Sequence, residues 1–251
     1  MSGLGEKVNE LLFELGSHKI PGLPLTNYMF FLLIAFVLTL VFFLVASRRL
    51  SMVPKGIGNV AEMGLEFIRD NVVVDVMGPE GKGFLPFIGT IFFFILFNNL
   101  IGLIPGFKPG TGTMGTTVTW ALVVFIVYNA IGIRKHGAWG YLKSFYPPGV
   151  VWPLAVFVMI LELISHFIRP LTLSVRLFAN MFAGHVILGI FSIFTVLLFQ
   201  APGVAKVMGL LPIAMQIVMY AFELFVAFIQ AYVFAILTAV YIGGALHAGE
   251  H

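Results

Sequence analysis

The sequence of 251 residues contains no cysteine and few charged residues. The lack of cysteine excludes disulfides, thiolate metal sites and cysteine nucleophiles. Asp, Glu, Lys and Arg make up 10% of the chain, against about 25% in a typical soluble domain. Hydrophobic residues make up 60%, which excludes disorder, and the net charge of +3 is too small for a nucleic-acid surface. We therefore expect most of the chain to lie in a membrane.

Long apolar stretches without formal charges predict where the chain crosses the membrane. About 20 apolar residues suffice for a helical crossing, so we expect spans at 28–47, 84–104 and 116–133. The apolar stretches 150–200 and 207–246 are longer than one perpendicular helix needs, and we expect long, strongly tilted helices there. An extra partial entry within 150–200 is the alternative. The predicted fold is an all-α polytopic membrane protein with about five crossings.

Positive charges are divided unequally between the two sides of this single membrane domain, 1–251. The richer side should be cytoplasmic, which places residues 1–27 outside and the C-terminus inside. The richer side holds Arg48, Arg49, Lys55, Arg69, Lys82, Arg134, Lys135 and Lys143, and the other holds Lys7, Lys19, Lys108 and Lys206.

Residues 57–76, between the first two spans, have apolar residues at helical spacing. Glu62, Glu66 and Arg69 lie on the opposite face of such a helix. This pattern predicts an amphipathic helix on the cytoplasmic surface. Contact of this helix with partner subunits is the alternative interpretation.

Three local patterns resemble binding sites but lack the necessary context. Gly110–Gly115 matches G-x-G-x-x-G, yet it follows a membrane span rather than a strand, so we expect residues 105–115 to form a flexible external turn. Glu162 and His166 are spaced like metal ligands, but a second such pair is missing from the sequence, so we predict no metal. Asn98 and Asn99 predict hydrogen bonds between helices. No cofactor or nucleotide site is expected.

Arg176 lies within an apolar stretch, where insertion costs at least about 2.5–3.5 kcal/mol. It cannot escape this cost by losing its proton. Extension of the side chain to the interface is one explanation. However, Asn180 and Gly184 follow at helical spacing, with Ala179 and Ala183 beside them. This small, polar stripe predicts close approach of another helix, or water.

The last helix carries a matching polar stripe, which must face protein or water. If the last two helices are antiparallel, His185 and Glu223 could pair and relay protons, since histidine changes charge near neutral pH. Glu162 and His166 lie on the other side of Arg176, so the sequence predicts two proton paths separated by one cation. The stripe consists of Gln216, Tyr220, Glu223, Ala227, Gln230, Phe234, Thr238 and Tyr241.

Three segments together resemble subunit a of the rotary F-type ATP synthases. They are Pro170–Gly184, which holds the most specific motif around Arg176, Asn99–Pro105 and Phe222–Tyr241. The resemblance covers nearly the whole chain. It implies that Arg176 is the essential arginine of the stator.

The same resemblance implies roles for six further residues. Asn180 and Gln230 match polar positions near the arginine, with Gln230 close to Arg176 across the helix pair. His185 and Glu223 match the outer half-channel, in the mitochondrial-type order. Glu162 and Ser165 match the inner half-channel. It assigns no role to His166 or Arg169.

The implied partners are a rotor ring of small carboxylate-bearing membrane subunits, membrane subunits of the peripheral stalk and the remaining ATP synthase subunits. The chain itself would have no catalytic site and would bind no nucleotide or cofactor. It would lie in a bacterial inner membrane or an equivalent energy-coupling membrane. Protons are favoured as the coupling ion because a histidine has no use in a sodium path. A secondary proton or cation antiporter and a membrane scaffold are the alternative functions.

Overall fold

A computed structural model describes residues 5, 7, 9–11, 13, 16–20, 25–48, 56–146 and 151–248. Apart from one isolated bridge, the regular structure of these residues is helical, which confirms the all-α prediction. Five helices are long and apolar enough to cross a membrane. The comparison of positive charges on the two sides of the membrane included three residues that are not fully described. Arg49, Lys55 and the side chain of Arg48 lie outside the described part. The five helices are α2 (Asn27–Arg48), α5 (Leu85–Gly102), α6 (Met114–Lys143), α7 (Trp152–Gln200) and α9 (Leu210–Leu246).

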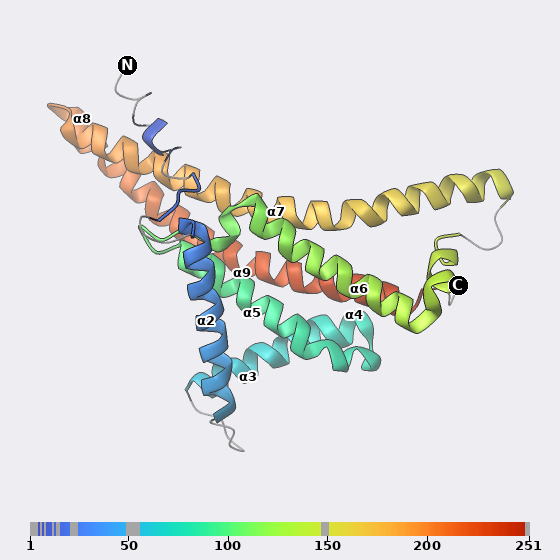
Figure 1. The fold of residues 1–251 in the computed structure, drawn as a ribbon. Coiled ribbons are helices and arrows are strands. Elements are labelled where there is room, and N and C mark those ends of the chain that lie inside the picture. Colours follow the sequence, from blue (N-terminus) through green and yellow to red (C-terminus); the bar gives the residue numbers. More distant parts are fainter. Residues whose placement is uncertain are drawn as a thin grey trace.

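Helices α7 and α9 form the frame of the molecule, joined by the short helix α8 (Val204–Met208). They lie side by side and antiparallel, while α5 and α6 pack against α9 (Figure 1). Helix α2 runs at a steep angle to this pair and contacts α5. The 49 residues of α7 span about 74 Å at 1.5 Å per residue, which exceeds the thickness of the hydrocarbon core of about 30 Å.

Pro170 lies inside α7 without ending it. A proline has no N–H, so the carbonyl four residues earlier, that of His166, loses its helical donor. The hydroxyl of Tyr128 in α6 donates a hydrogen bond of 3.4 Å to this carbonyl. The neighbouring helix thus supplies the donor that the proline removes, as expected for a kink-forming residue in lipid.

The expected amphipathic helix at 57–76 is divided into three parts. Helix α3 (Ile57–Ile68) passes into a π-helix, η1 (Arg69–Val74), and then into α4 (Asp75–Met77). The wider turn changes which side chains face inward. Ile57 and Val60, placed on the apolar face by their spacing, are exposed, whereas Val73 and Met77 join the core beside α5 and α9.

The glycine-rich segment after α5 differs from the expected flexible external turn. The short helix η3 (Gly110–Gly112) is buried and packs between α2, α5, α6 and α7. Thr111 donates a hydrogen bond of 2.8 Å to Asn99, and a Cβ at position 110 would lie 2.6 Å from Oδ1 of Asn98. Glycine therefore permits the loop to approach the polar side chains of α5 closely.

Basic residues mark two opposite ends of the helices. Lys108 lies 5.6 Å from the ring centroid of Tyr28, where α2 begins and α5 has ended. Lys135 lies 3.8 Å from Glu80, in the short helix η2 (Pro79–Phe84) that precedes α5. At this second end α6 kinks at Gly137, whose φ of 74° suits glycine, and continues beyond the expected limit of 133.

Candidate functional site

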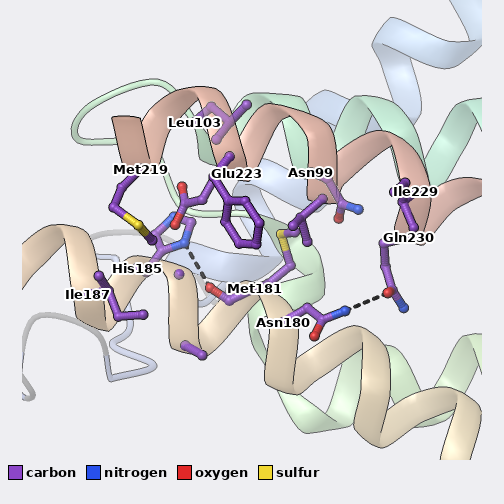
Figure 2. Close-up of a pocket in the computed structure, with 14 residues that line it drawn as sticks. Asn99, Leu103, Asn180, Met181, His185, Ile187, Met219, Glu223, Ile229 and Gln230 are labelled. Carbon is purple, nitrogen blue, oxygen red and sulfur yellow. Dashed lines mark hydrogen bonds between the residues drawn. The ribbon is translucent and has the colours of Figure 1, made fainter. Parts of the chain in front are cut away.

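Polar side chains from three helices line a cavity of about 280 Å³ between α5, α7 and α9 (Figure 2). The antiparallel pairing of α7 and α9 brings these residues together, although they are far apart in the sequence. The polar residues of the wall, together with Gly184, are Asn99, Asn180, His185, Glu223 and Gln230.

Glu223 is the acidic residue of this cavity. Its side chain is buried, with 6% exposed, and neither carboxylate oxygen has a hydrogen-bond partner among the described residues. Gly184 of α7 lies directly opposite, where a Cβ would overlap Oε1 of Glu223. The glycine therefore makes the space that the carboxyl group occupies.

His185 faces the same part of the cavity as Glu223 (Figure 2). Its Nδ1 lies 2.9 Å from the carbonyl oxygen of Met181, and its Nε2 lies 3.0 Å from that of Gly102 at the end of α5. The two side chains thus share the cavity, but the described atoms include no hydrogen bond between them. Because a neutral imidazole has one N–H, it can donate to only one of the two carbonyls, whereas the imidazolium satisfies both.

Asn180 and Gln230 form the other end of the cavity, where Nδ2 of Asn180 donates a 2.6 Å hydrogen bond to Oε1 of Gln230 (Figure 2). Gln230 is buried, with 2% exposed. Asn99 donates a bond of 3.4 Å to the carbonyl of Ala227, as predicted for a bond between helices. Asn99 was not predicted to belong to the site, although an asparagine in an apolar span signals a polar contact.

Arg176 lies one turn before Asn180 on α7, and its side chain is exposed on the surface of the chain. Within the described part of the chain, no hydrogen bond or ion pair holds it. Ser165, Ala179 and Ala183 are exposed too, so this part of α7 faces away from the other helices of this chain. Asn180 and Gly184 of the small, polar stripe instead contact α9, which provides the close approach predicted for the stripe.

The polar stripe of α9 faces the interior of the chain. Glu223, Ala227, Gln230 and Thr238 are buried, and the other members of the stripe are buried or half-buried. The prediction that this face meets protein rather than lipid is therefore correct. The two stripes meet where Asn180 contacts Gln230 and where Gly184 lies opposite Glu223.

A second cavity, of about 400 Å³, lies between α6, α7 and the end of α9. Glu162, His166 and Arg169 line it, together with Tyr128 and other residues. Arg169 binds Glu162 through a contact of 2.9 Å and lies 5.7 Å from the ring centroid of Tyr241. Ser165, which the resemblance also assigns to the inner half-channel, is exposed and is not among the residues that line this cavity.

Comparison with known proteins gives consistent results. The profile of the family described as ATP synthase A chain matches residues 29–243. "ATP synthase subunit a" of Hyphomonas neptunium is 44% identical over 90% of this chain and 88% of that protein. The proteins of that name from Rhodococcus erythropolis and Acidiphilium cryptum are 43% and 42% identical. These alignments cover 90% and 88% of this chain, and 84% and 88% of the two relatives.

Proposed function

The chain belongs to the ATP synthase subunit a family, and from this premise we propose that its two cavities are the ends of a proton path interrupted at Arg176. It is the proton-translocating stator subunit of the membrane sector and works in a complex with the other ATP synthase subunits. The observation that carries the proposal is the buried polar cavity between α5, α7 and α9, beside an outward-facing arginine.

The cavity that holds His185 and Glu223 is the outer half-channel. A proton entering from outside is passed by His185 and Glu223 toward Asn180 and Gln230, whose side chains line the inner part of the wall. It then neutralises a carboxylate of the rotor ring, which is supplied by another subunit. A neutral carboxylic acid enters lipid at far lower cost than a carboxylate, so the ring can rotate.

The outward face of Arg176 is the surface along which the rotor carboxylates pass. A guanidinium cannot lose its proton, so Arg176 favours the ionised rotor carboxylate and repels protons that would cross between the half-channels. Its exposed side chain suits a hydrated, transient contact, because a tight ion pair would hold the ring in place. Each charge driven through 100 mV supplies about 2.3 kcal/mol for rotation.

Glu162 and Ser165 belong to the inner half-channel, where the rotor carboxyl group releases its proton. Glu162 lines the second cavity, and Ser165 lies on the outward face together with Arg176. The C-terminus then lies in the cytoplasm and the N-terminus outside, in keeping with the positive-inside rule. The chain has no catalytic site of its own, and ATP chemistry takes place on other subunits.

The partners in this arrangement are a rotor ring of carboxylate-bearing subunits along α7 and α9 and membrane subunits of the peripheral stalk. Many large apolar side chains of α7 and α9 are exposed on the isolated chain. Exposed apolar surface of this kind is suited to contact with membrane helices or lipid. The antiporter alternative would place no ring against this face.

The experiment that tests the function is Arg176→Ala in the assembled ATP synthase, measured in membrane vesicles. We expect proton-driven ATP synthesis to be lost and passive proton leak to rise. Arg134→Ala is the matched control, because Arg134 is exposed near the kinked end of α6. Coupled synthesis at a normal rate in the Arg176 variant would overturn the proposal.

A further inference from the structure

His166 in α7 has a fixed orientation that its packing does not require. Its side chain is buried, with 4% exposed, and its Nε2 lies 2.9 Å from Oδ1 of Asn129 in α6. The amide of Asn129 is itself oriented, since its Nδ2 donates a bond of 2.7 Å to the carbonyl of Phe125. Oδ1 must therefore accept, and Nε2 of His166 carries the hydrogen.

The second ring nitrogen of His166, Nδ1, then carries a lone pair and no hydrogen. Nδ1 is buried and has no hydrogen-bond partner within the described part of the chain. Buried polar atoms without a partner are rare. A cavity of about 400 Å³ adjoins the ring, and the polar groups in its wall can hold water. The titratable and charged groups that line it beside His166 are Glu162 and Arg169 of α7, Tyr128 and Tyr141 of α6, Tyr241 of α9 and His247.

We propose that His166 is a further proton-transfer residue, placed between Glu162 and the water of the inner cavity; this rests on the function proposed above. In the direction of ATP synthesis, a water of the cavity bridges the two groups: the O–H bond of protonated Glu162 breaks as this water takes the proton, and another O–H bond of the water breaks as the N–H bond forms at Nδ1. The imidazolium then passes this proton to water, which leaves as a hydronium ion. Nε2 keeps its own hydrogen and donates it to Oδ1 of Asn129 throughout. His166 therefore returns to the same tautomer.

Arg169 is a positioning residue for this transfer. Its contact of 2.9 Å with Glu162 and its position 5.7 Å from the Tyr241 ring centroid hold the carboxyl group at the wall of the cavity.

Aromatic packing is the alternative explanation for the burial of His166. The rings of Phe125, Tyr128 and Phe145 lie with their centroids 5.1–5.3 Å from that of His166. Packing would explain a ring at this position. It requires neither the amide of Asn129 nor a free nitrogen beside the cavity.

The test uses assembled ATP synthase in inverted membrane vesicles, whose exposed face is the inner face. ATP-driven proton pumping is measured with His166→Ala. We expect pumping to slow at least about tenfold, because a proton-transfer group typically contributes more than that. Imidazole added to the medium should restore much of the rate, since the cavity opens toward that side and the missing group is an imidazole. Phe125→Leu is the packing control, because the ring of Phe125 packs against His166 but does not line the cavity. This variant should pump normally, with no response to imidazole.

Two further variants keep the test decisive if His166→Ala fails to assemble. His166→Gln fills the same space without a basic nitrogen and should slow pumping to a similar extent. Asn129→Leu leaves the histidine in place but removes the hydrogen bond that fixes its tautomer. This variant should slow pumping by a few fold. Normal pumping in His166→Gln, or equal losses in the His166 and Phe125 variants without imidazole rescue, would overturn the inference. Either result would leave the outcome for Arg176→Ala, and hence the proposed function, unaffected.

Discussion

Gly184 of α7 faces Glu223 of α9 with no room for a side chain between them, because a Cβ at position 184 would overlap Oε1 of the glutamate. Small residues permit two membrane helices to approach closely, and here the space gained holds a carboxyl group. His185, the next residue of α7, lines the same cavity. The glycine therefore determines where the buried acid lies relative to the proton path.

Gly184→Ala should impair proton transfer without removing any titratable group. The added methyl group must displace the carboxyl of Glu223 or push α7 and α9 apart. A displacement of about 1 Å can reduce the rate of a positioned group by roughly 100-fold, so we expect proton-driven ATP synthesis to fall at least about tenfold. The rate of ATP synthesis in vesicles at a fixed proton-motive force measures this effect.

Gly115→Ala is the matched control for this prediction. Gly115 also lies in a transmembrane helix, α6, but apart from the helix's own backbone no atom lies within 4 Å of a Cβ built there. This substitution should leave the rate unchanged. Normal synthesis in the Gly184 variant as well would show that the position of Glu223 is not critical.

Exchange of His185 and Glu223 should restore function only in part. Glu223→Gln alone removes the titratable group, and we expect proton transfer to slow at least about tenfold. The double variant His185→Glu with Glu223→His returns both group types to the cavity. However, a carboxylate at position 185 would face the carbonyl oxygens of Met181 and Gly102, which now lie close to the imidazole nitrogens. Proton pumping of the single and double variants measures the recovery, and a double variant no better than Glu223→Gln would contradict the shared role.

Residue types and spacing were sufficient to predict the helical class, five helices long and apolar enough to cross a membrane, and the inward face of α9. Glu223 and Gln230 were placed correctly on that face because an expensive polar residue in lipid must face protein or water. The contact of His185 with the carbonyl of Gly102 could not be predicted, because every residue carries a backbone acceptor and only the fold shows which one is near. The outward direction of Arg176 was also unpredictable, since the identity of the residues does not reveal which side chains of a polar stripe face the other helices of the chain.

The buried position of η3 was missed for a different reason. Glycine and threonine in a short loop suggest a flexible turn, whereas here glycine serves close approach and Thr111 completes the hydrogen bonding of Asn99. The asparagines of α5 are the feature of the sequence that could have indicated the buried position of η3. A buried amide needs partners, and the segment that follows it is the nearest source of them.

Thr111→Val should destabilise the packing of this segment against α5. The change keeps the shape of the side chain but removes the donor to Oδ1 of Asn99, which is buried with 1% exposed. An unsatisfied buried acceptor costs about 1–3 kcal/mol. Thermal denaturation of the purified complex should show an earlier transition for Thr111→Val and little change for Thr111→Ser, which keeps the hydroxyl. Equal transitions for the two variants would show that the hydrogen bond contributes nothing.

Tyr128 and Pro170 should be coupled in stability although their side chains need not touch. The proline frees the carbonyl of His166, and the Tyr128 hydroxyl donates to it. Tyr128→Phe should therefore cost about 0.5–1.5 kcal/mol in the native background. In a Pro170→Ala background the N–H of residue 170 becomes the donor, so the same change at Tyr128 should cost nearly nothing. Denaturation of the purified complex for the four variants of this double-mutant cycle gives the coupling energy. A cost of Tyr128→Phe that is the same in both backgrounds would mean that the hydroxyl acts elsewhere, for example in the cavity beside His166.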